Sequence, residues 1–110
     1  MNNEDIFQEI LMEGLEDWVP VDRVIGLTRE SKESQGEDFK AATVEVIESL
    51  LGRELIVVGE IGETGFEAWT GDIGDIVAKV VAKLDRVNWA PFGGVCWLAN
   101  TPRGDSEVSG

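Results

Sequence analysis

The feature that most constrains the fold is an amphipathic stripe that follows Asp72. Its apolar side chains recur at helical spacing, Asp72 can cap the first turn, and basic side chains gather toward the last turn, where they suit the helix dipole. One face of such a helix has to be buried against other elements. The stripe therefore predicts a helix on a core, with these apolar positions: Ile73, Ile76, Val77, Val80, Val81 and Leu84.

Two amphipathic segments begin the chain. Apolar residues within about 4–17 fall on one face of a helix that Asn3 can cap. Pro20 suits a helix start, and the apolar spacing after it predicts a shorter second helix. Residues 31–38 contain no large apolar group, so we expect a connection there.

A third helix is predicted over about 38–51, with Gly52 as the residue just past its end. Its inward positions are apolar, and its outward positions are rich in glutamate. The outward face comprises Glu37, Lys40, Ala41, Val44, Glu45 and Glu48.

The second half of the chain carries strand signals. Residues 55–58 and 66–69 predict a β-hairpin, because the glycine-containing turn at 62–65 accepts turn dihedrals. A loop over 88–94 leads to a predicted last strand at 95–100, and we expect the polar tail from about 102 to be frayed. At 110 residues, a single domain with one core is expected. The predicted fold class is α+β and winged-helix-like, with three helices, a hairpin, a fourth helix and a final strand.

Four short blocks carry a resemblance over roughly residues 5 to 105. They are DWVPV at 17–21, LLGREL at 50–55, GFEAW at 65–69 and CWLANT at 96–101. These blocks resemble those of a family of small, acidic, winged-helix-like bacterial proteins without an established activity. Some small acidic bacterial proteins of this general kind are immunity proteins that bind and neutralise a toxin, which is an analogy of type.

Charge limits the partners. The chain has 22 acidic and 9 basic side chains and no histidine, which gives a net charge of −13, and residues 1–60 hold 15 of the acids and 5 of the bases. Such a field repels phosphate backbones and anionic lipid, and it attracts basic proteins. We therefore expect a basic protein partner, with nucleic acid and membrane disfavoured.

The sequence offers little chemistry. Without histidine, and with Cys96 in an apolar strand, the usual nucleophile and base pairs are missing. Neighbouring acids such as Glu37 and Asp38 lack the spacing of a metal-binding loop and fit helix caps and solvated faces. We expect no enzymatic activity, cofactor or metal. The lone cysteine and the absence of a secretory signal or an apolar span predict a cytoplasmic protein.

The four tryptophans divide into two pairs. Trp18 and Trp97 have apolar neighbours and are expected in the core. Trp69 ends a strand and Trp89 lies in a loop, so each either anchors a partner or packs on the fourth helix, and loop Phe92 is a further candidate anchor.

These observations favour a non-enzymatic protein that inhibits a basic partner such as a toxin. Because a site that binds RNA or DNA phosphates is itself positive, carboxylates on a rigid helix would occlude it. The alternatives are a winged-helix transcriptional or phage-type regulator that binds DNA, and an adaptor with neither role. The candidate contact residues are Glu37, Asp38, Glu45 and Glu48, with Trp89 as an anchor.

Overall fold

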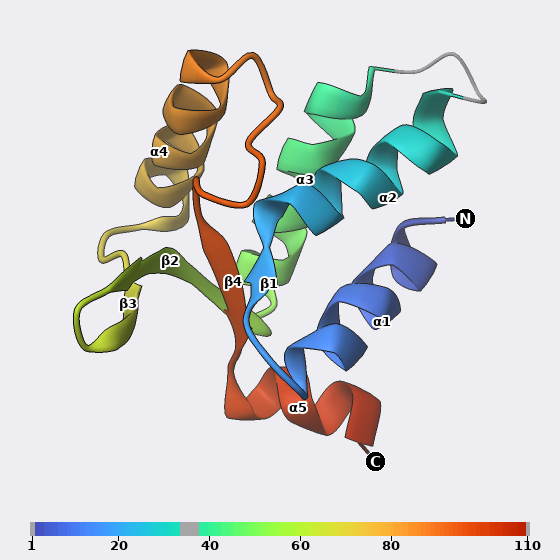
Figure 1. The fold of residues 1–110 in the computed structure, drawn as a ribbon. Helices are drawn as coiled ribbons and strands as arrows, with labels where there is room; N and C mark the ends of the chain where they lie inside the picture. The colour runs from blue at the N-terminus through green and yellow to red at the C-terminus, as the bar shows by residue number, and fades with distance from the viewer. Residues whose placement is uncertain (1, 34–37, 110) are drawn as a thin grey trace.

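A four-stranded antiparallel sheet organises the chain in the computed structural model, which describes residues 2–33 and 38–109, with only the backbone for residues 32 and 33 (Figure 1). Within these residues the elements are α1 (Asn3–Gly14), β1 (Val19–Pro20), α2 (Val21–Glu33), α3 (Phe39–Gly52), β2 (Ile56–Gly62), β3 (Gly65–Ala68), α4 (Ile73–Arg86), β4 (Trp97–Asn100) and α5 (Pro102–Ser109). The strand order is β1-β4-β2-β3, so the last strand of the sequence lies between β1 and β2.

The register places one row of apolar residues across the sheet. Val19 of β1 lies opposite Leu98 of β4, which in turn lies opposite Val58 of β2. All three are at most 2% exposed. Because α1 contacts β1 and β4, α2 contacts β1, and α3 contacts β2, these helices cover the face that carries this row.

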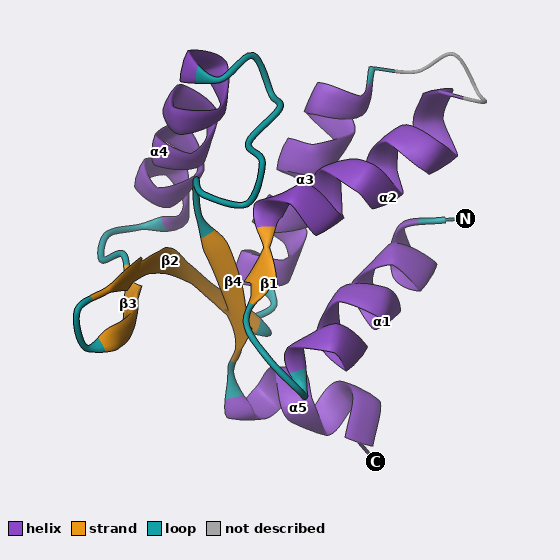
Figure 2. Cartoon of the chain, viewed as in Figure 1, coloured by secondary structure: helices purple, strands orange, loops and turns teal. Residues whose placement is uncertain are grey.

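The α+β class is confirmed, but the number and order of the elements differ from the predicted layout. Figure 2 shows the additions: the short strand β1 before α2 and the helix α5 at the end of the chain. The insertion of β4 between β1 and β2 also departs from a simple three-helix and hairpin unit. The winged-helix assignment stays a prediction.

The elements with the strongest local signals lie where they were predicted. Asp72 caps α4, and its carboxylate accepts a hydrogen bond from the Asp75 backbone N–H at 2.9 Å. The β2 and β3 strands form the predicted hairpin, in which Ile61 faces Phe66. None of the helices in residues 2–33 and 38–109 has the length and apolarity needed to cross a membrane.

The first two helices do not begin where the sequence indicated: α1 begins earlier and α2 begins later. Asn2, and not Asn3, caps α1, because the Asn2 side chain accepts the Asp5 N–H at 2.9 Å. Pro20 belongs to β1 and does not start a helix, since an edge strand tolerates its missing N–H. The second helix extends through residues 31–33 of the predicted connection, and 34–37 lie outside the described residues.

The end of α3 uses a glutamate where glycine is the usual residue. Gly52 is the last residue of the helix, and Glu54 takes the left-handed conformation with φ 60°. The N–H groups of Leu55 and Glu54 donate to the carbonyls of Leu50 and Leu51, which is a Schellman ending. The prediction that Gly52 follows the helix was therefore wrong.

The predicted frayed tail is instead the helix α5. The Thr101 hydroxyl accepts the Gly104 N–H at 3.0 Å, so Thr101 caps the helix and Pro102 takes its first position. Gly104 is buried against the Leu55 carbonyl, where a Cβ would collide. The Asn100 amide donates to the Leu11 carbonyl at 2.8 Å and joins this end of the chain to α1.

Candidate functional site

The predicted acidic residues that the structure describes share one side of α3. Asp38, Glu45 and Glu48 are exposed there, and Glu37 lies outside the described residues. The Asp38 carboxylate caps the helix by accepting the Lys40 N–H at 2.9 Å, and Glu45 accepts the Asn3 side-chain amide at 3.2 Å. Within residues 2–33 and 38–109, no ion pair neutralises these three acids. We call them the α3 stripe.

The cation nearest to this stripe in the sequence is Lys40, which lies over the Trp89 ring, 5.8 Å from its centroid, and forms no ion pair with the stripe within the described residues. The next cations along the chain are engaged elsewhere. Arg53, at the end of α3, pairs with Glu4 of α1 at 3.0 Å and lies over the Phe7 ring. Arg23 likewise pairs with Glu9 and Glu13, at 3.5 and 2.6 Å. The hydrogen bond to Glu13 and the charges around it raise the pKa of Arg23 against the effect of desolvation. The α3 stripe therefore keeps its negative charge.

Trp89 is not an exposed anchor, because its side chain is only 5% exposed. Asn88 takes a left-handed conformation after α4, and the Trp89 N–H donates to the Leu84 carbonyl at 2.8 Å. This Schellman ending turns the indole back onto the helix, where its Nε1 donates to Asp85 at 2.8 Å and its ring meets Phe39 edge to face. Trp89 therefore packs in the core against α4, and the prediction that it anchors a partner from an exposed loop was wrong.

The other aromatic residues follow the expectation only in part. Trp18 was expected in the core but is 41% exposed, whereas Trp97 and Trp69 are half-buried. Phe92 is 94% exposed, in a loop that is held to α2 by a hydrogen bond of 2.7 Å from the Gly93 N–H to the Asp22 carboxylate. The apolar neighbours of Trp18 in sequence did not reveal that its own side chain faces outward.

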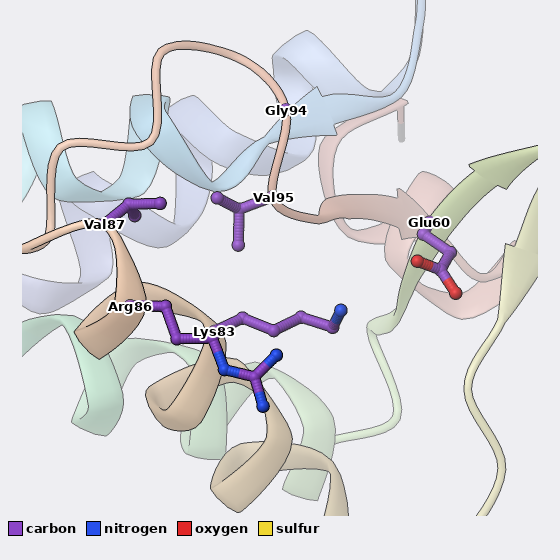
Figure 3. Close-up of a pocket in the computed structure, with 6 residues that line it drawn as sticks. All are labelled: Glu60, Lys83, Arg86, Val87, Gly94 and Val95. Carbon is purple, nitrogen blue, oxygen red and sulfur yellow. The ribbon is translucent and has the colours of Figure 1, made fainter.

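A small open pocket of about 210 Å³ lies between α4 and the loop before β4. Lys83 and Arg86 reach it from α4, while Glu60 faces it from β2 (Figure 3). Val87 and Val95 supply its apolar side. Its volume is below the roughly 300 Å³ at which pockets for organic ligands begin, so it suits a small ion better than a substrate.

The α4 cations form the basic counterpart of the acidic helices. Lys79, Lys83 and Arg86 follow one another at helical spacing, and in the described part of the chain no carboxylate pairs with them. Lys79 and Lys83 instead lie over the Trp69 ring, with the ammonium of Lys79 4.6 Å from its centroid. The helical spacing of these three cations was visible in the sequence. There it was explained only by the favourable interaction of basic side chains with the C-terminal end of the helix dipole.

The remaining reactive group is shielded. Cys96 is buried and free, and desolvation raises the pKa of its thiol to about 12, so the thiolate is scarce at neutral pH. In the part of the chain that the structure describes, histidine, cysteine, aspartate and glutamate side chains form no cluster of three that would hold a metal ion. The described surfaces of this domain present charged side chains and exposed apolar side chains.

Comparison with known proteins adds no assignment: no protein family, curated protein or solved structure matches this chain.

Proposed function

We propose that this protein is a non-enzymatic binding domain that inhibits a basic protein partner, such as a toxin that acts on nucleic acid. The observation that carries the proposal is the α3 stripe, whose three exposed acids have no cation in an ion pair within the described residues. Exposed carboxylates on a rigid helix attract a positive surface from a distance and can accept hydrogen bonds from it on contact.

The rest of the molecule is consistent with such a role. The net charge of −13 gives a field that favours encounters with a basic protein. The single free cysteine, Cys96, fits a reducing compartment, and we therefore propose a cytoplasmic location.

The proposal is tested by capture with the tagged protein from nuclease-treated native lysate, at low and moderate salt. We expect one stoichiometric basic protein, identified by mass spectrometry. Glu48→Lys should weaken its retention about tenfold at low salt, with a smaller effect at moderate salt. Glu107→Lys on α5 changes the net charge equally at another exposed position and serves as the control. Failure to recover a basic protein, or equal effects of both variants, contradicts the proposal.

A second candidate function is a DNA-binding regulator, which the unpaired α4 cations favour. Lys79 and Arg86 are exposed at helical spacing, as phosphate contacts require. In this case duplex DNA would be retained with a steep dependence on salt, and Arg86→Glu would abolish retention while Glu48→Lys would leave it intact or improve it. The same two variants therefore separate the two functions.

A further inference from the structure

The strand register defines a second face of the sheet, opposite the row of Val19, Leu98 and Val58. Side chains alternate along a strand, so the residues between those buried positions point the other way. Ala99 lies opposite Val57, and Ile61 lies opposite Phe66. We call this the outer sheet face. Its apolar members in the strands include Val57, Ile61, Phe66, Trp97 and Ala99. Trp18, just before β1, joins the face through its ring contact with Phe66.

Every position of this face is uncharged. Between its larger members the register places only Pro20, Gly59 and Ala68. An antiparallel sheet with one face toward water normally alternates apolar and polar residues, so that the solvated face is polar. In a chain with 28% charged residues, an entirely apolar outer sheet face is an exception that folding alone does not require.

The outer sheet face is also partly accessible to solvent. Trp18, Val57 and Ile61 are 41%, 36% and 45% exposed, whereas Val19, Val58 and Leu98 on the covered face are at most 2% exposed. The Trp18 ring packs against Phe66, with centroids 5.8 Å apart, and so bridges the two ends of the face. A bare apolar surface of this kind is typical of a protein contact.

The charges around the face decide what kind of partner fits it. Glu16 and Asp17 precede Trp18, and Glu63 lies in the hairpin turn beside Ile61. No lysine or arginine occurs in the strands or in residues 16–20, 56–70 and 95–101 around them. A second copy of the chain would bring the same acids against this rim, and like charges across an interface are costly.

We propose that the outer sheet face binds a protein segment whose apolar side chains are flanked by lysine or arginine. The inference rests on the proposed function. It names the surface that supplies affinity for the basic partner, because binding there would bury apolar area, which the acidic α3 stripe does not offer. A stable interface takes about 800 Å² from each partner, more than these few side chains expose, so the acidic rim belongs to the contact. Apolar residues supply the centre, and Glu16, Asp17 and Glu63 meet the flanking cations.

The test uses blocked synthetic peptides and amide chemical shifts of the labelled full-length protein. The peptide KKLFLKK should bind and shift amides of β2, β3 and β4 around Val57 and Ile61. EELFLEE, with the same centre and opposite charge, should not bind. KKSGSKK, with the same charge and no apolar centre, should bind at least tenfold more weakly. Shifts confined to α3 or to the α4 pocket, or equal affinity for both lysine peptides, would overturn the inference.

Matched variants complete the test. Val57→Thr and Ile61→Thr keep a β-branched side chain and should each weaken KKLFLKK about tenfold. Val87→Thr is the control, because Val87 is 37% exposed, as Val57 is 36% exposed, but lies after α4. Circular dichroism checks that all three fold. Equal effects at Val57 and Val87, or sedimentation that reveals a dimer abolished by Val57→Thr, would refute the inference.

Failure of the inference and failure of the proposed function give different results. If a basic protein is captured from lysate and retained by Ile61→Thr but lost by Glu48→Lys, the function stands and the outer sheet face is wrong. If neither lysine peptide binds and no basic protein is captured, both are wrong.

Discussion

Gly104 is a position where the addition of one methyl group should destabilise the protein. A Cβ at Gly104 would overlap the Leu55 carbonyl oxygen, which is a backbone atom that no change of rotamer can move. That oxygen also accepts the Thr101 N–H at 3.0 Å. Relief of the overlap therefore requires α5 to move away from Leu55, which directly precedes β2, and weakens the hydrogen bond that fixes the start of α5.

The expected magnitude follows from three terms. Alanine in place of glycine favours a helix by about 1 kcal/mol. Overpacking against a fixed group costs about 1–3 kcal/mol, and a lost backbone hydrogen bond costs about 1 kcal/mol. We therefore expect Gly104→Ala to lower the free energy of unfolding by about 2 kcal/mol, which corresponds to a fall in Tm of roughly 10 °C for a domain of this size.

The measurement is urea unfolding followed by tryptophan fluorescence, with Gly52→Ala as the matched control. Gly52 is also helical, but a Cβ there would meet only Ile73 Cδ1 at 4.0 Å. The same substitution should therefore stabilise the protein by about 0.5–1 kcal/mol at Gly52. If Gly104→Ala stabilised the protein as Gly52→Ala does, α5 would not pack closely on Leu55 through Gly104, and the reasoning would be refuted.

Two further stability predictions concern single residues. Glu54→Gly should raise the free energy of unfolding by about 0.5–1 kcal/mol in urea titrations, because glycine relieves the left-handed conformation and the exposed Glu54–Arg103 pair adds little; a loss of stability would contradict this. Burial raises the pKa of Cys96 from 9.0 to about 12, so the thiol of the unfolded state loses its proton at a lower pH than the thiol of the folded state. The contribution of the protonated thiol to stability is therefore fully present below about pH 9 and is lost as pH rises toward 12. Between pH 8 and 10 the wild type should therefore lose about 1 kcal/mol more than Cys96→Ala, and parallel pH profiles would rule the effect out.

The sequence was sufficient for elements with strong local signals. The stripe after Asp72, the glycine turn of the hairpin and the apolar face of α3 each depend on residues within one segment, and all three elements formed as predicted. The acids of the α3 stripe could be placed for the same reason, since helical spacing alone puts Asp38, Glu45 and Glu48 on the outward side.

The elements that were missed depend on contacts between distant segments. A polar helix of eight residues such as α5 is marginal in isolation. It forms here because Gly104, which has no side chain, lets the Leu55 carbonyl pack closely against the helix. In addition, the Asn100 amide donates a hydrogen bond to Leu11, 89 positions earlier in the chain. Local signals existed in Thr101 and Pro102, which are common residues at helix starts, but they gain weight only once the tertiary contacts are known.

The sequence of β2, one of the two central strands, already indicates an unusual second face of the sheet. Residues 55–58 are apolar without alternation, a pattern typical of a strand that is covered on both faces. In the structure only one face is covered: Ile56 and Val58 are at most 2% exposed, while Val57 between them is 36% exposed. The second face of β2 thus has the composition of a buried surface without an element of the described chain packed over it. That mismatch is the physical reason to expect a partner at the outer sheet face.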